Sequence, residues 1–109
     1  MIETKSINDS LVVRLTIKEA GLGQSDQFKH ELFALLDKGH RRLIIDLEEV
    51  TYIDSSFLGA LVAGLKHALF LKADIVLANL NKDILGLFEL IRMDKVFSIF
   101  QNVDEAVGS

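Results

Sequence analysis

The sequence contains no cysteine, no proline and no tryptophan among its 109 residues. Without cysteine there can be no disulfide, no thiolate zinc site, no CxxC redox motif and no cysteine nucleophile. An excess of positive charge is also absent, because 12 Lys and Arg residues face 16 Asp and Glu residues and the formal charge is −4. Surfaces that bind nucleic acid or anionic membranes need clustered positive charge, so we expect neither partner.

Long hydrophobic runs are missing as well. No apolar run approaches the roughly 20 residues of a membrane span, and the first residues lack the basic-then-apolar profile of a signal peptide. Half of the residues are nevertheless hydrophobic, which is too many for a disordered chain. We therefore expect a single domain over residues 1–109 that is soluble, cytoplasmic and not inserted into a membrane.

The first part of the chain predicts a β-hairpin followed by a loop. Residues 11–17 are short and rich in β-branched side chains, as strands are, and residues 2–7 form a weaker pattern of the same kind. The turn-forming residues 8–10 between them predict a hairpin. Residues 18–24 contain two glycines and predict a loop.

A helix and a buried strand are predicted next. Ser25 or Asp26 is suited to cap the helix, and Gly39 is suited to end it in the left-handed conformation. The helical stripe consists of Phe28, Leu32, Leu35 and Leu36. Residues 42–47 contain the apolar run Leu43-Ile44-Ile45 and are typical of a strand buried on both faces.

The second half predicts two further helices, a strand and a short end. Residues 48–54 connect to a helix, residues 75–78 form a short strand, and Asn81 is suited to cap the next helix. The two helical stripes are Leu58, Leu61, Val62, Leu65 and Leu69, and then Ile84, Leu87, Phe88 and Ile91. Residues 96–100 predict a short strand, and residues 104–107 the start of a last helix.

The predicted order of elements is β-β-α-β-α-β-α-(β)-α. Strands that alternate with helices indicate an α/β domain with a mostly parallel sheet and right-handed crossovers. The initial hairpin adds one antiparallel strand, so the sheet is expected to be mixed, with helices packed against it.

Common cofactor and metal motifs are not found. The start Gly21-Leu22-Gly23 resembles a dinucleotide loop, but Asp26 occupies the place of the third glycine, and there is no phosphate-binding GxxxxGK[ST] loop. His30, His40 and His67 lack the close spacing of metal ligands and are expected at the surface. We expect no cofactor and no metal.

Two patterns hint at catalysis, and neither is complete. Asp46 ends a predicted strand like the phosphoacceptor of a response receiver, but no acidic pair follows residues 11–17 to hold magnesium, so a structural role is favoured. Ser55 and Ser56 lie where a connection enters a helix, as in a nucleophile elbow, but bulky residues stand two places away where that turn needs small ones. We expect no enzyme and no catalytic residue.

Residues 51–62 place three polar residues between an apolar connection and an apolar helix. The simplest interpretation is a helix cap, in which Asp54 or Ser55 accepts hydrogen bonds from the first turn. Gly59 would let the start of the helix pack closely on a neighbour. A second interpretation is a phosphorylation switch at one serine, because a helix N-terminus accommodates a phosphate and its charge would repel a docked partner.

The segment Asp54-Ser55-Ser56-Phe57-Leu58-Gly59 resembles the hallmark of the STAS family, the sulfate-transporter and anti-sigma-factor-antagonist domains. The strand ending Ile44-Ile45-Asp46-Leu47 and the connection Val50-Thr51-Tyr52-Ile53 precede it as in that family. The resemblance continues through residues 79–100 and extends to the order of elements over nearly the whole chain.

This resemblance implies an anti-sigma factor antagonist that switches partners. Ser55 would be the phosphorylation site, and the partner-binding residues would be Asp54, Ser55, Ser56, Phe57, Leu58 and Gly59. The partner would be an anti-sigma factor that is also a serine kinase and itself binds the ATP, while a phosphatase would reset the switch. The alternative is a STAS interaction domain of an anion transporter or of a lipid-transport complex.

Two departures from the family pattern stand out. Phe57 replaces the glycine that follows the serine pair, and its side chain belongs either to the core or to an exposed contact that changes partner choice. Residues 18–24 are longer than the corresponding family loop and lack its aspartate, so the partner surface is not carried over there.

Overall fold

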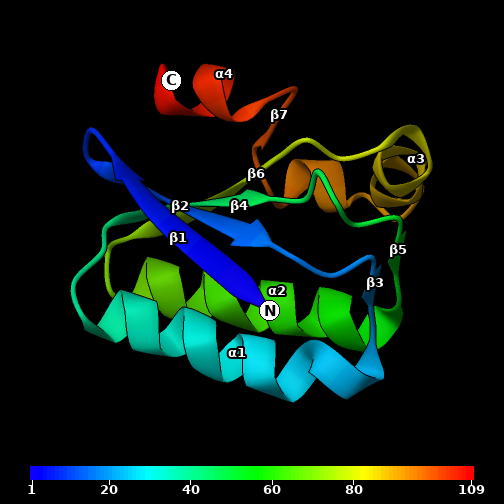
Figure 1. Ribbon diagram of the computed structural model, residues 1–109, viewed down its shortest axis with the longest axis horizontal. Coiled ribbons are helices and arrows are strands. Elements are labelled where there is room, and N and C mark those ends of the chain that lie inside the picture. The colour runs from blue at the N-terminus through cyan, green and yellow to red at the C-terminus, as the bar shows by residue number, and fades with distance from the viewer.

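The computed structural model describes all residues 1–109 and contains one five-stranded sheet in the order β1-β2-β4-β6-β7 (Figure 1). The strands are β1 (Ile2–Ile7), β2 (Ser10–Leu15), β4 (Arg42–Asp46), β6 (Asp74–Ala78) and β7 (Ile99–Phe100). β1 is antiparallel to β2, and every other pair is parallel. Asn8 has a φ of 54°, as the first central residue of a two-residue hairpin turn requires. The predicted mixed sheet and hairpin are confirmed.

Helices cover the two faces of the sheet unequally. α1 (Leu22–Asp37) and α2 (Ser55–Phe70) lie side by side on one face, and the short α4 (Val103–Val107) lies on the other (Figure 1). α3 (Lys82–Leu90) and the 3-10 helix η1 (Met93–Lys95) lie at one end. The outer face of β1 and β2 is therefore left without a covering helix. None of the helices combines the length and apolarity needed to cross a membrane.

The main core lies between the sheet and the pair α1 and α2, and a small second core lies under α4. Side chains alternate between the faces of a strand, so in β4 Leu43 and Ile45 enter the main core while Ile44 enters the second. All three are fully buried. The apolar run of these three residues follows from this burial on both faces.

Close packing of α1 on α2 depends on Gly64 and not on Gly59. A Cβ atom on Gly64 would lie 2.7 Å from Cδ1 of the buried Leu32, whereas a Cβ on Gly59 would meet nothing within 4 Å. The prediction of a close approach at Gly59 was wrong, because that glycine is exposed and lines an open hollow between α1 and α2 instead of touching α1.

Three predicted core positions are exposed: Leu69, Leu87 and Ile91, by 59%, 36% and 39%. In α2 the small residues Ala60, Gly64 and Ala68 form part of the buried face, and an apolar stripe drawn through large side chains alone overlooks them. The predicted strand over residues 96–100 is reduced to Ile99–Phe100, because a 3-10 turn precedes it and Phe97 is buried in the core.

The segment 18–24 is not simply a loop. It contains β3 (Glu19–Ala20), which pairs in parallel with β5 (Tyr52–Ile53), and α1 already begins at Leu22. The helix begins before both predicted caps, Ser25 and Asp26, because its N-cap residue is Gly21. The Ser25 hydroxyl donates to the Leu22 carbonyl inside the helix. At the other end of α1, Gly39 has a φ of +102°, which confirms the left-handed ending.

Candidate partner-binding site at the start of α2

The carboxylate of Asp54 caps two helices at once. Its Oδ1 accepts a hydrogen bond from the Phe57 amide of α2 at 3.0 Å, and its Oδ2 accepts one from the Leu22 amide of α1 at 2.9 Å. The Asp54 amide donates to the carbonyl of Ala20 at 3.1 Å and so continues the pairing of β3 with β5. The predicted cap by Asp54 is confirmed for α2, and the same side chain ties the start of α1 to it.

Gly21 makes room for this carboxylate. A Cβ atom at Gly21 would lie 2.8 Å from Oδ2 of Asp54, closer than such atoms approach. The Gly21 amide donates to the Gln24 side chain at 3.1 Å, which completes the start of α1. Gly21, one of the two glycines that predict a loop over residues 18–24, is therefore needed to make room for Asp54, which is far along the chain.

We expect Asp54→Ala to lower the free energy of unfolding by about 2 kcal/mol, since each lost cap costs about 1 kcal/mol. Asp54→Asn retains one acceptor oxygen and is expected to lose about half as much. Urea unfolding with an unchanged m-value measures both losses.

The Asn81 side chain accepts from the Ile84 amide of α3 at 2.8 Å, which confirms the predicted cap, and also donates to the Val50 carbonyl at 3.3 Å. Asn102→Ala is therefore the matched control for a single cap, because the Asn102 side chain only accepts from the Glu105 amide of α4 at 2.8 Å. Its expected cost is about 1 kcal/mol. If Asp54→Ala were no more costly than Asn102→Ala, a role of Asp54 at both helix starts would be refuted.

Ser55 and Ser56 occupy the first turn of α2 in different surroundings. Ser55 is exposed, and the cap bonds of this turn use the Asp54 carboxylate and leave the Ser55 hydroxyl uninvolved. Ser56 is half-buried and lines a hollow of about 200 Å³ between α1 and α2, together with Ser25 and Lys29. The positive end of the helix dipole lies at both serines, but only Ser55 presents its hydroxyl openly to a partner.

Phe57 is a core residue. Its side chain is fully buried and stacks on Phe28 of α1, with ring centroids 4.5 Å apart and an interplanar angle of 18°. Of the two interpretations left open, the structure supports the core one, so the expectation that Phe57 contacts a partner is not met by its side chain. Leu58 is half-buried and Gly59 is exposed, which leaves both accessible beside the serines.

Two exposed apolar residues beside Asp54 were not predicted as site residues. Leu22 is 74% exposed at the start of α1, and Tyr52 is 56% exposed in β5, opposite Glu19 of β3. Tyr52 lies shortly before Ser55 in the sequence. Leu22 is close to Ser55 because its amide donates a hydrogen bond to Asp54, the residue before Ser55. No sequence signal marks Leu22, because its position depends on a hydrogen bond to a residue 32 positions away.

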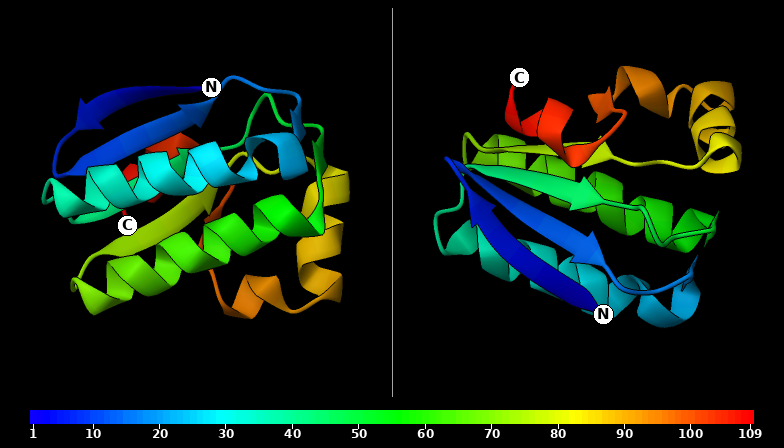
Figure 2. Two further views of the ribbon diagram at one scale, coloured as in Figure 1. Left: turned by 90° about the horizontal axis from the view of Figure 1, so that it is seen from below. Right: turned by 45° about the horizontal axis from the view of Figure 1, so that its top comes forward.

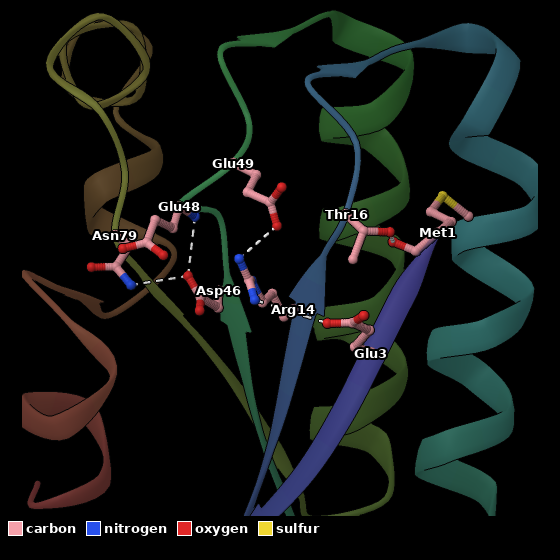
Figure 3. A network of polar contacts seen from close by, with 8 residues as sticks. All are labelled: Met1, Glu3, Arg14, Thr16, Asp46, Glu48, Glu49 and Asn79. Carbon is pink, nitrogen blue, oxygen red and sulfur yellow. Dashed lines mark hydrogen bonds and ion pairs between the residues drawn. The ribbon is translucent and has the colours of Figure 1, made fainter.

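Asp46 has a structural role, as the sequence favours. It is 8% exposed at the end of β4, where its Oδ1 accepts hydrogen bonds from the Glu48 amide at 3.0 Å and the Asn79 side chain at 2.9 Å (Figure 3). The bond from Asn79 joins the end of β4 to the residue that follows β6. No group of three or more His, Asp or Glu residues is arranged to hold a metal ion.

His67 differs from the expected surface histidine. Its side chain is only 24% exposed, stacks on Phe33 with ring centroids 4.2 Å apart, and places Nε2 2.7 Å from Asp37 Oδ1. The close packing of α2 on α1 brings these residues together at the far end of the helix pair, away from Ser55.

The chain is similar to known proteins over most of its length. A Thermotoga maritima protein named "Putative anti-sigma factor antagonist" is 28% identical over 102 residues, which cover 93% of this chain and 90% of the relative. A Bordetella bronchiseptica protein named "Putative anti-sigma factor antagonist BtrV" is 27% identical over 85 residues, 78% of this chain and 73% of the relative. The crystal structure of a Thermotoga maritima protein described in the same words superposes with a TM-score of 0.90 at 25% identity, covering 98% of this chain and 92% of that one.

The fold is shared more widely. The Bacillus protein SpoIIAA, solved in unphosphorylated and phosphorylated forms, superposes with a TM-score of 0.74 at 15% identity. The murine anion transporter Slc26a9 matches over 18% of its own chain at a TM-score of 0.79 and 18% identity. These likenesses show the fold alone. The model of the STAS domain family matches residues 1–106, and the chain therefore belongs to the STAS domain family.

Proposed function

We propose that this protein is an anti-sigma factor antagonist that is regulated by phosphorylation of Ser55. In its unmodified form it binds an anti-sigma factor and thereby frees a sigma factor. The anti-sigma factor is also a serine kinase, binds the ATP itself, and transfers the γ-phosphoryl group to the Ser55 hydroxyl. The phosphorylated protein dissociates, and a phosphatase removes the phosphate and restores binding.

The observation that carries this proposal is that the residues that hold the first turn of α2 in place differ from the residue that presents an exposed hydroxyl there. Asp54 caps the helix and Phe57 anchors it in the core, while Ser55 between them is exposed and takes part in neither. A phosphate on Ser55 would therefore leave the cap and the core contact in place. It would also sit at the positive end of the helix dipole, which favours a negative group.

Regulation of this kind must act locally. A phosphate changes the formal charge from −4 by only about −2, which is a small change for the whole molecule. At the site itself, the phosphate would join the carboxylate of Asp54 and lie near the exposed apolar side chains of Leu22 and Tyr52. A partner surface that covers those side chains would have to bury a hydrated dianion, which disfavours binding.

The relatives support the proposal in two ways. Two curated relatives of similar length carry the name of anti-sigma factor antagonist. SpoIIAA, which shares the fold, is named as an anti-sigma factor antagonist and has been solved in a phosphorylated form.

The proposal is tested by intact-mass spectrometry and peptide mapping of the protein purified from its own host under phosphatase inhibition. We expect one phosphate, on Ser55, in a fraction of the molecules that changes with growth or stress. If the protein stayed unmodified in every condition, Ser55 would be only a surface residue of a capped helix. A constitutive interaction domain, as in the transporter alternative, would then be the better explanation.

A further inference from the structure

β1 is an edge strand of the five-stranded sheet. It pairs with β2 on one side only, and Figure 2 shows no element beyond it, with α1 on its inner side. Glu3, Thr4, Lys5 and Ser6 are all exposed. The strand is held firmly at its start, because the Met1 carbonyl accepts from the Thr16 amide at 2.8 Å and from the Thr16 hydroxyl at 3.0 Å (Figure 3).

The hydrogen bonds to β2 determine which backbone groups of β1 point outward. In an antiparallel pair, opposite residues alternate between pairs that exchange hydrogen bonds and pairs that do not. The bond from Thr16 to Met1 makes that pair a bonded one, so the register also bonds Glu3 to Arg14 and Lys5 to Val12. The N–H and C=O groups of Ile2, Thr4 and Ser6 therefore point away from the sheet and are available to another strand.

This alternation allows few registers with a second β1 strand. If two copies of β1 pair antiparallel through Ile2, Thr4 and Ser6, the two-fold axis must pass through one of the residues 3, 4 or 5. An axis at Glu3 sets Glu3 opposite Glu3, and an axis at Lys5 sets Lys5 opposite Lys5, and like charges directly opposite each other are destabilising. An axis at Thr4 instead sets Glu3 of each copy opposite Lys5 of the other.

We propose that two copies of this protein dimerise through β1 about an axis at Thr4, which joins their sheets into one continuous sheet. Thr4 then pairs with Thr4, and Ile2 with Ser6, through backbone hydrogen bonds. Glu3 and Lys5 fall at the positions that exchange no backbone bonds, where side chains approach each other more closely. Two complementary ion pairs therefore select this register.

The side-chain directions fit the proposed contact. Glu3 and Lys5 lie on the sheet face away from α1 and α2, since their partners Arg14 and Val12 are on that face. This face is open around β1, with a hollow of about 550 Å³ lined by Glu3, Lys5 and Arg14 among others. The start of α2 is not part of the contact, so the dimer does not depend on the function proposed for Ser55.

Sedimentation velocity of the full chain tests the proposal, over concentrations from roughly 20 to 500 μM because an interface of one strand is small. We expect a monomer–dimer equilibrium that weakens several-fold as NaCl is raised from about 0.1 to 1 M, because exposed ion pairs are screened. A monomer at all concentrations would overturn the proposal.

Charge reversal tests the register. Glu3→Lys and Lys5→Glu each place like charges opposite one another at both pairs, and each is expected to weaken the dimer about tenfold or more. The double variant Glu3→Lys with Lys5→Glu restores both pairs and the dimer. A mixture of the two single variants is expected to form a heterodimer, although each variant alone dimerises much more weakly than the wild type.

Two controls separate the contact from folding. Glu3 also lies 3.9 Å from Arg14 within the chain, and the double variant loses that contact too, so its recovery of the dimer cannot come from stability. Thr4→Pro removes an outward N–H that β2 does not use, and is expected to give a folded monomer. A dimer that persists in the single charge variants would show that another surface is responsible and would overturn the proposal.

Discussion

Ser55→Asp is expected to weaken binding to the anti-sigma kinase about tenfold or more, which is a loss of about 1.4 kcal/mol or more. An aspartate at this position carries a permanent negative charge beside Asp54 and near the exposed Leu22 and Tyr52. The partner surface that covers these residues would have to accommodate the buried charge. Isothermal titration calorimetry with each anti-sigma kinase of the host, expressed separately, measures the loss.

The same substitution is expected to leave the fold intact. A negative side chain in the first turn of a helix interacts favourably with the helix dipole, by about 0.3–1 kcal/mol. The unfolding free energy of Ser55→Asp should therefore be unchanged or slightly raised while binding is weakened. A loss of binding that came with a comparable loss of stability would indicate damage to the helix start, and would count against a switch.

Ser55→Ala completes this test, because it retains an uncharged surface but has no hydroxyl to accept a phosphoryl group. We expect it to bind the kinase like the unmodified wild type and to remain bound when ATP is added. Ser56→Ala is the matched control, since Ser56 is half-buried in the hollow beside α1, and this variant should still be released by ATP. If Ser55→Ala and the wild type were released equally, the switch would not be at Ser55.

Phe57→Ala is expected to lower the free energy of unfolding by about 3–5 kcal/mol, as for other buried aromatic residues. The Phe57 ring is fully buried and stacked on Phe28 at 4.5 Å, so the truncation leaves a cavity between the starts of α1 and α2. Domains of this size have a total stability of roughly 5–15 kcal/mol. The loss is therefore large enough to bring the variant near unfolding, and urea titration at low temperature measures it.

A second pair of variants keeps this prediction testable if Phe57→Ala does not fold. Phe57→Leu retains most of the buried volume and should cost less than about half as much. Leu58→Ala, at the neighbouring half-buried position, should cost at most about 1 kcal/mol. A Phe57→Ala variant that was stable but had lost its partner would instead favour the other interpretation of this residue, an exposed contact.

The replacement of the family glycine by Phe57 has a consequence for this chain. The aromatic side chain fixes the first turn of α2 against α1 from inside, while Asp54 fixes it from outside. Ser55 is thus presented on a turn that is held at two points. This rigidity would keep Ser55, the proposed phosphorylation site, in one geometry before and after modification.

The sequence alone predicted the features that depend on neighbouring residues. A helix cap needs a polar side chain within a few positions, so Asp54 and Asn81 were identifiable as caps. The left-handed ending at Gly39 and the hairpin turn at Asn8 follow from local backbone preferences in the same way. The apolar run of β4 indicated burial on both faces, and with the order of elements it predicted the mixed α/β sheet.

Only the tertiary structure decided the features that join distant residues. The start of α1 was missed because its cap is a carboxylate 32 residues away, and the pairing of β3 with β5 was missed because each strand has only two residues. The role expected of Gly59 belongs to Gly64, since the contact depends on which side of α2 faces Leu32. The surface around Ser55 includes the exposed Leu22 for the same reason. No local sequence pattern predicts this, because the position of the start of α1 depends on its tertiary contacts with the start of α2.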